Sequence, residues 1–138
     1  MKILKSILLG LSLLVVCGAA KASDVPLTED YVINTYVDAL TQGNLNGINN
    51  ILAANAQFNV LQNKKVVTFS KQDMVDYLKS NKGVQQNCIT ATTLIENNAD
   101  NAIVKVDMKY ADHVQSNLVT MINTDNGWKI SNVYSIFE

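Results

Sequence analysis

The stretch that decides the fold is VKVDMKY, residues 104–110. Apolar and charged residues alternate along it, so successive side chains fall on opposite faces. This period of two is typical of a half-buried β-strand with one face on a core and the other toward water. Comparable segments fill the chain from Cys88 onward and are separated by turn sequences at 97–101, 112–113 and 125–127. The second half therefore predicts four long antiparallel strands in a meander.

The chain before residue 88 shows a helical period instead. Thr28 is a suitable N-cap, apolar residues then recur at helical spacing, and Gly43 ends the segment. Ser70 and Asp73 fit a capping box at the start of another helix. The predicted elements are helices at 28–43, 44–52 and 70–83 and short strands at 57–61 and 66–69. We therefore expect an α+β fold, with three N-terminal helices packed on a curved, mainly antiparallel sheet.

The first 22 residues predict an export signal. A basic start at Lys2 and Lys5 precedes an apolar run at 7–16, and Ala20-Lys21-Ala22 offers small residues where a signal peptidase reads. The apolar run is too short to span a bilayer. We expect a signal peptide at 1–22, cleavage before Ser23, and one domain at 23–138 in the periplasm or secreted, with no membrane span.

A lipoprotein is the alternative at this end of the chain. Leu14-Val15-Val16-Cys17 roughly resembles a lipobox, although Val16 stands where Gly, Ala or Ser is normal. A lipid on Cys17 would hold the domain at a membrane surface, whereas cleavage after Ala22 would release it.

Charge and cysteine content exclude several classes of function. Removal of residues 1–22 leaves eight basic against twelve acidic residues, a net charge of about −4, and arginine is absent. An acidic chain without arginine is not expected to bind nucleic acid. Cys88 then stands alone, so no internal disulfide can form, and a lone cysteine beside an apolar strand is most often a small buried hydrophobe.

Two stretches carry a resemblance to a known family. The sequence YVDALTQGN at 36–44 and Lys105-Val106-Asp107-Met108 resemble the nuclear transport factor 2-like superfamily, the cystatin-like cone fold shared with ketosteroid isomerase and SnoaL-type cyclases. With its export signal and asparagine-rich body, the chain is most similar to the exported bacterial branch described as lumazine-binding. The resemblance covers essentially all of 23–138. It implies a pocket between the helices and the concave sheet face, open at the wide end.

The resemblance also locates the positions that isomerase-like members use for proton transfer. Those members pair a tyrosine with two carboxyl groups in an apolar pocket. Tyr36 falls on the tyrosine position, while the carboxyl positions fall on or beside Val60 and near Thr120. Because neither valine nor threonine can serve as the carboxylate, we assign no catalytic residue and lean against an enzyme.

The remaining titratable groups do not form an obvious site. Asp107 alternates with lysines and is expected to face water, and His113 is expected in an exposed turn. Asp38 and Asp76 fall on polar helix faces. One histidine with scattered carboxylates predicts no metal site, and no cofactor is indicated.

The function we expect is that of an exported, non-enzymatic domain that binds a small, flat, largely apolar or aromatic molecule in the cone cavity. For each residue proposed to bind this molecule, packing in the hydrophobic core is the alternative role. The predicted ligand-binding residues are Tyr36, Phe58, Val60, Met108, Thr120 and Phe137. Two other functions stay open: an isomerase- or cyclase-like enzyme using Tyr36, and a homodimeric protein-interaction module with a filled cavity.

The last strand predicts the homodimer. Trp128, Ile130, Tyr134 and Ile136 are expected on one face of it, with Val133 and Phe137 on the other. A strand that is apolar on both faces is covered on both faces. Helices would cover one of them, and a second subunit is a natural cover for the other.

Overall fold

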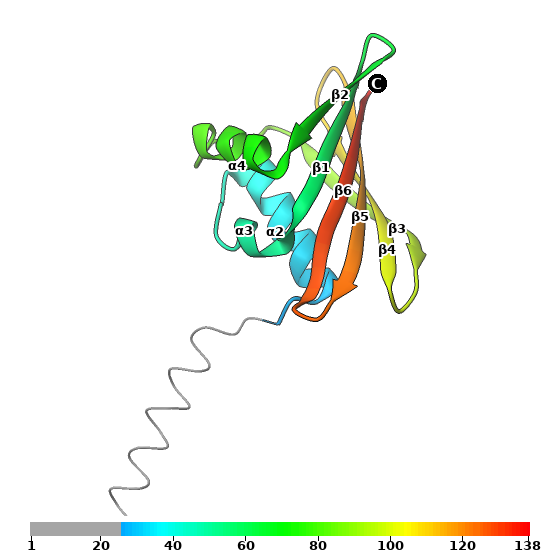
Figure 1. Ribbon diagram of the computed structural model, residues 1–138. Coiled ribbons are helices and arrows are strands. Elements are labelled where there is room, and N and C mark those ends of the chain that lie inside the picture. Colours follow the sequence, from blue (N-terminus) through cyan, green and yellow to red (C-terminus); the bar gives the residue numbers. More distant parts are fainter. Residues whose placement is uncertain (1–25) are drawn as a thin grey trace, which may run out of the picture.

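The computed structural model describes residues 26–138. The predicted signal peptide, its cleavage site and Cys17 lie outside the described residues. Figure 1 shows the helices gathered on one side of a long, twisted sheet. The elements in chain order are α2 Glu29–Gln42, α3 Ile48–Ile51, β1 Leu52–Gln62, β2 Lys65–Ser70, α4 Lys71–Ser80, β3 Ile89–Asn97, β4 Asn101–Lys109, β5 Val114–Thr124 and β6 Gly127–Phe137. The α+β fold class is confirmed.

Helix α2 begins and ends where its local sequence predicts. The Thr28 hydroxyl accepts a hydrogen bond from the Tyr31 N–H at 3.1 Å, which satisfies one free donor of the first turn. Gly43 ends the helix in the left-handed region, at φ 66°. A Cβ there would lie 2.4 Å from the backbone nitrogen of Gly83. Glycine therefore serves both as the helix cap and as the point where the segment after α4 approaches.

Helix α3 is shorter than the predicted helix at 44–52. It starts only after Gly47, which has a positive φ of 80°, and Leu52 is already extended and paired with Ile130. Two lysines satisfy carbonyl groups at its end: Lys71 Nζ donates to Leu52 O (3.2 Å), and Lys129 Nζ donates to Asn50 O (2.6 Å). Tertiary pairing of Leu52 thus ends the helix and lengthens β1.

Helix α4 has the predicted capping box. The Ser70 N–H donates to Asp73 Oδ2 at 3.0 Å, and the Asp73 N–H donates to Ser70 Oγ at 3.1 Å. The helix packs on β1 and β2 through its buried side chains, Val75 and Leu78. It therefore covers one half of the sheet, while α2 lies beside it over the concave face (Figure 1).

The six strands form one sheet in the order β2-β1-β6-β5-β4-β3. Strands β3 to β6 make the predicted antiparallel meander, and β1 joins it parallel to β6. Val106, Val119 and Val133 are at most 1% exposed on the face toward the helices. Together with Val32 and Tyr36 of α2, they form the centre of the core.

A bulge in β6 corrects the predicted face assignment of this strand. Between Thr120 and Met121 of β5, the partner on β6 changes from Asn132 to Ile130, so β6 holds one extra residue. The extra residue reverses the alternation, and Ile130 is fully buried on the core side. Tyr134 and Ile136 lie on the opposite, outer face, whereas Trp128 packs against the core. The prediction that all four share a face was wrong.

Candidate functional site: a pocket on the concave face

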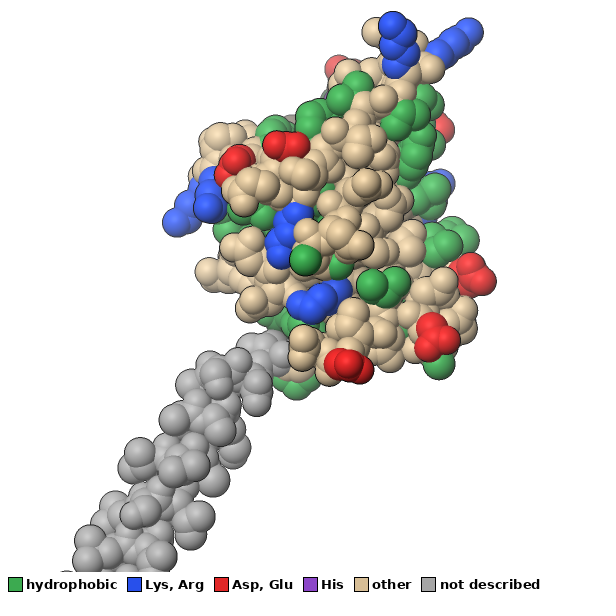
Figure 2. All heavy atoms as spheres, in the orientation of Figure 1, with side chains coloured by type: hydrophobic (Ala, Val, Ile, Leu, Met, Phe, Trp, Pro, Cys, Tyr) green, Lys and Arg blue, Asp and Glu red, His purple; other side chains and the backbone are tan. Residues whose placement is uncertain are grey.

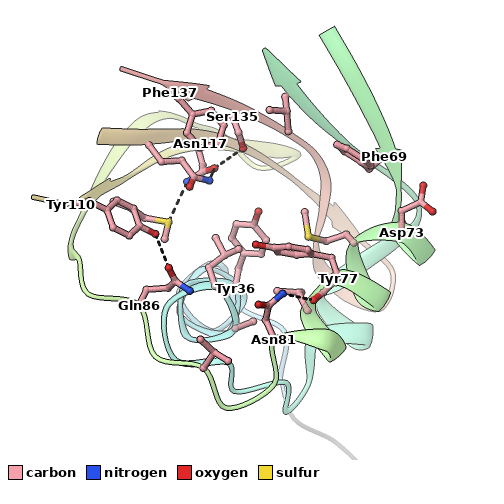
Figure 3. Close-up of a pocket in the computed structure, with 18 of the residues that line it drawn as sticks. Tyr36, Phe69, Asp73, Tyr77, Asn81, Gln86, Tyr110, Asn117, Ser135 and Phe137 are labelled. Carbon is pink, nitrogen blue, oxygen red and sulfur yellow. Dashed lines mark hydrogen bonds between the residues drawn. The ribbon is translucent and has the colours of Figure 1, made fainter. Parts of the chain in front are cut away.

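A cavity of about 700 Å³ lies between the concave sheet face and helices α2 and α4. Figure 3 looks into it, with the strands on one side and the helices on the other. Helix α2 contributes Tyr36, Ala39 and Leu40, and α4 contributes a full face that includes Met74, Tyr77 and Leu78. The strands contribute residues of β1, β2, β4, β5 and β6 to the opposite wall.

Tyr36 marks the inner part of this pocket. Its side chain is 1% exposed, and its ring stacks on Phe58 with a centroid distance of 6.5 Å. The ring points toward the middle of the pocket in Figure 3. Its hydroxyl makes none of the side-chain hydrogen bonds found within residues 26–138, and it is not among the fully buried side-chain atoms left without a partner, so the oxygen faces the open space of the pocket. Burial raises the pKa of the Tyr36 hydroxyl well above its ordinary value, so the group is a neutral donor.

A polar pair interrupts the apolar sheet wall opposite α2. Asn117 is fully buried, and its Oδ1 accepts hydrogen bonds from Ser135 Oγ at 2.6 Å and from Gln115 Nε2 at 3.1 Å. Its Nδ2 donates to the carbonyl of Val106 at 3.3 Å. Asn117 is thereby held in place, and the Ser135 oxygen keeps lone pairs that could accept a hydrogen bond from a ligand.

An aromatic pair forms another wall. Tyr110 donates to Gln86 Oε1 at 3.2 Å, and the His113 ring stacks on Tyr110 at a centroid distance of 4.5 Å. Nδ1 of His113 lies 2.7 Å from Asp112 Oδ1, a contact that lowers the pKa of that carboxyl. Burial, followed by its neighbour Cys88, raises the pKa of Tyr110. His113 thus lines the pocket and is half-buried, which differs from the expected exposed turn.

The segment after α4 closes one side of the pocket through backbone hydrogen bonds. The Gly83 N–H donates to Gly43 O at 3.0 Å, and the Gln86 N–H donates to Thr41 O at 2.6 Å. These bonds tie residues 83–86 to the end of α2, which places Val84 and Gln86 in the wall. The left-handed Gly43 is what permits this approach.

Four of the six predicted ligand-binding residues line the pocket: Tyr36, Val60, Met108 and Phe137. Phe58 lies behind Tyr36, is 1% exposed, and does not reach the cavity. Thr120 lies on the outer face, opposite Ile103 of β4, so its predicted place in the pocket was wrong. Both alternating sets of β5 mix apolar and polar residues, so the pattern alone does not identify the inner face, and the pairing with β4 turns Asn117 and Val119 inward.

Several wall residues were missed from the sequence. Met74, Tyr77, Leu78 and Asn81 recur at helical spacing along α4, and this spacing is a signal that could have identified them. Asn117 and Ser135 carry no such signal, because polar residues on a strand normally face water. Only the strand pairing shows that they lie together on the inner face.

Other candidate groups lie away from the pocket or lack partners for chemistry. Asp107 accepts a hydrogen bond from Ser116 Oγ at 2.7 Å and lies 3.8 Å from Lys105 Nζ, on the outer face. Cys88 is free and half-buried. In the part of the chain from 26 to 138, no three metal-binding side chains cluster together. No helix in that part is long and apolar enough to cross a membrane.

Solved structures share this fold at low sequence identity. An NTF-2 like protein of unknown function from Silicibacter pomeroyi matches with a TM-score of 0.67 and 16% identity, over 79% of this chain and 92% of the other. An NTF2-like protein of unknown function from Methylobacillus flagellatus gives 0.65 and 20%, over 79% and 88%. A structure titled as a putative ketosteroid isomerase from Shewanella frigidimarina gives 0.55 and 20%, over 79% and 98%. These likenesses show the fold.

A family described as "Putative lumazine-binding" matches residues 28–135, which is nearly all of the described chain. No curated protein sequence matches significantly. The match includes both helices of the pocket and all but the last residues of the sheet. This chain therefore belongs to the family described as "Putative lumazine-binding".

Proposed function

We propose that this chain is an exported domain that binds a small, largely apolar molecule in the pocket on its concave face. The observation that carries the proposal is the Tyr36 hydroxyl, a protonated donor without a partner in the described chain, set within an apolar cavity. A donor that faces a cavity lined mostly by apolar side chains can bind an acceptor atom of a ligand, and one such hydrogen bond contributes about 0.5–1.5 kcal/mol.

The size and walls of the pocket support binding. Its volume of about 700 Å³ lies within the roughly 300–1,000 Å³ common for small-molecule sites. Aromatic and aliphatic side chains form most of the wall, and Tyr36 and Ser135 supply polar groups on opposite sides of it. Such a pocket favours a flat molecule that carries an acceptor at its inner end.

The family description suggests one probe of this chemistry. Lumazine is a flat heteroaromatic dione, so its carbonyl oxygens could accept from Tyr36 while its rings lie between apolar walls. We expect weak binding, with a Kd between about 1 µM and 1 mM, because a small ligand offers little area to offset the cost of association.

Two experiments test ligand binding. Native mass spectrometry of the protein purified from its own host should show a retained small molecule. In a calorimetric titration with lumazine, Tyr36→Phe should weaken binding about threefold to tenfold, the contribution of one hydrogen bond. Tyr31→Phe is the matched control, since Tyr31 is on α2 but outside the pocket wall. Equal affinities of wild type and Tyr36→Phe would contradict the assigned role.

An acid–base enzyme is the second candidate, because Tyr36 and His113 line the same pocket. The two positions where isomerase-like members are expected to hold carboxylates are Val60 and Thr120, and the inward residue nearest Thr120 along β5 is Val119. An assay on a β,γ-unsaturated ketosteroid should therefore give background rates, since a positioned acid or base contributes roughly 10²–10⁴-fold. Turnover that disappears in both Tyr36→Phe and His113→Gln would establish the enzyme instead.

We also propose a homodimer through the outer sheet face. Leu118, Tyr134 and Ile136 adjoin one another there by strand pairing. In the part of the chain from 26 to 138, the helices lie on the other side of the sheet (Figure 1). The variant Leu118→Lys/Ile136→Lys should be monomeric in light scattering, because it removes apolar contact and adds like charges across the interface. A monomeric wild type at micromolar concentration would refute the dimer.

Export remains part of this proposal. It rests on the basic start, the apolar run and the Ala20-Lys21-Ala22 site. N-terminal sequencing of the protein from its host should begin at Ser23. A lipid-modified Cys17 at the N-terminus would show a membrane-anchored lipoprotein instead.

A further inference from the structure

Exposed apolar side chains gather at one end of the molecule. Eleven large hydrophobic residues are exposed within residues 26–138, and seven of them lie at the mouth of the pocket or beside it. Four line the mouth itself: Phe69, Tyr77, Val84 and Phe137. Three lie on the adjacent β1–β2 hairpin: Leu61, Val66 and Val67. An apolar surface concentrated in this way marks a binding surface for another molecule.

The β1–β2 hairpin is apolar on both of its faces. Leu61 pairs with Val66 on the outer face, and Val60 pairs with Val67 on the inner face. Figure 1 shows this hairpin projecting beyond the rest of the sheet. A ligand in the pocket would cover only the inner face of the hairpin. A second copy of the chain on the outer sheet face would cover only the outer face of the hairpin. A partner that surrounds the hairpin tip covers both.

Charge distinguishes the hairpin end from the opposite end. Lys64 and Lys65 form the tip, and residues 61–70 contain no acidic residue. The opposite end carries Glu29 and Asp30 at the start of α2 and Asp100 and Asp125 in the strand turns. Figure 2 shows basic side chains at the tip at the top of the molecule and several acidic side chains near the bottom, with further groups of both signs between them. The hairpin is therefore complementary to an anionic surface.

The mouth end also holds Asp112 and Glu138, but they follow β4 and β6 rather than the hairpin. Asp112 lies against His113 and Glu138 pairs with Val114, across the pocket from β2. Asp73 and Asp76 of α4 line the pocket together with Phe69 and Tyr77, so the surface that is complementary to an anionic partner is the β1–β2 hairpin alone, not the rim or the whole end of the molecule.

We propose that the β1–β2 hairpin binds the surface of a membrane that contains anionic phospholipid. Leu61, Val66 and Val67 would enter the interface, while Lys64 and Lys65 would meet the phosphate groups. This contact places the pocket mouth against the bilayer, where largely apolar molecules accumulate. The proposed membrane contact is a function separate from ligand binding, and it does not require a ligand in the pocket.

The test is flotation of the processed protein with vesicles. We expect it to float with vesicles of phosphatidylglycerol and phosphatidylcholine in equal parts and not with phosphatidylcholine alone. Lys64→Asn/Lys65→Gln should weaken partitioning roughly 25-fold, about fivefold for each lysine. Asparagine suits position 64, where φ is 65°. Val66→Thr/Val67→Thr should also weaken it while keeping β-branched residues in the strand.

Lys105→Gln is the matched control, because it removes one positive charge from the middle of the outer face and should leave partitioning unchanged. The proposal is overturned if wild type does not float with anionic vesicles, if it floats equally with neutral ones, or if Lys105→Gln weakens partitioning as much as Lys64→Asn. A wild-type oligomer that dissociates in Val66→Thr/Val67→Thr would likewise overturn it, since the hairpin would then contact a second copy.

Failure of this proposal is distinguishable from failure of ligand binding. The hairpin variants should keep the lumazine affinity of wild type, because none of residues 64–67 lines the pocket. Conversely, Met108→Trp, which fills the cavity, should still float with anionic vesicles.

Discussion

The two faces of the sheet are built from the same strands and have opposite properties. On β4 and β5 the inner residues Val104, Val106 and Val119 are at most 7% exposed, whereas their neighbours Lys105, Asp107 and Leu118 lie on the outer face. Helices cover the inner face but leave a cavity of about 700 Å³. Within residues 26–138, no helix covers the outer face. The comparison teaches that alternating side chains give the sheet two different faces. The elements that pack on each face then decide whether it forms a core, a pocket or an exposed surface.

The largest effect should come from truncating a side chain on the inner face. Phe58→Ala should lower the free energy of unfolding by about 3–5 kcal/mol, because it removes a ring that is 1% exposed and supports Tyr36. Leu118→Ala on the outer face should cost less than about 1 kcal/mol in the monomer. Urea denaturation of both variants measures the difference. Equal losses would mean that the outer face is packed as tightly as the inner one.

A smaller loss of stability should follow from disturbing the close backbone contact between Gly43 and Gly83, which joins the end of α2 to the segment after α4. Gly43→Ala combines a left-handed φ of 66° with a Cβ 2.4 Å from Gly83 N, so we expect about 2–3 kcal/mol. Gly83→Ala has a similar φ of 75° and no heavy atom within 4 Å, so strain alone should cost about 1 kcal/mol. Thermal unfolding compares the two. A Gly83→Ala loss as large as that of Gly43→Ala would exclude the close contact as the cause.

Filling the cavity should affect binding more than folding. Met108→Trp places a larger side chain in the pocket wall and should weaken lumazine binding at least tenfold, or about 1.4 kcal/mol. Circular dichroism should show an unchanged fold. If the variant unfolds while Phe69→Trp at the mouth folds normally, position 108 has no space beside it, and the filled-cavity interaction module becomes the better description.

The smallest effect should come from Thr120→Val. Because Thr120 lies on the outer face opposite Ile103, the variant should bind lumazine with the wild-type affinity. The same calorimetric titration applies to it, with Tyr36→Phe as the positive control. Weaker binding by Thr120→Val alone would indicate that the outer face carries the ligand site.

Local signals allowed much of the fold to be predicted. The Thr28 cap, the Gly43 stop and the Ser70–Asp73 capping box depend on residues within a few positions of one another, so the sequence contains the whole interaction. The alternation at 104–110 likewise identified β4 and its inner residues Met108 and Val106. The family resemblance placed Tyr36 in the pocket, and its helical spacing from Val32 agrees with that inward position.

The chain by itself thus determined the order of helices and strands, and which residues of β4 and α2 turn inward, because these features arise from neighbours in sequence. Only the tertiary structure decided where α3 gives way to β1 and which faces of β5 and β6 turn inward, since both alternating sets of these strands mix apolar and polar residues and one extra residue in β6 reverses the alternation. Those two strands decide that Asn117 and Ser135 enter the pocket while Thr120 does not. Strand pairing joins residues far apart in sequence, so its register is settled when the whole sheet packs.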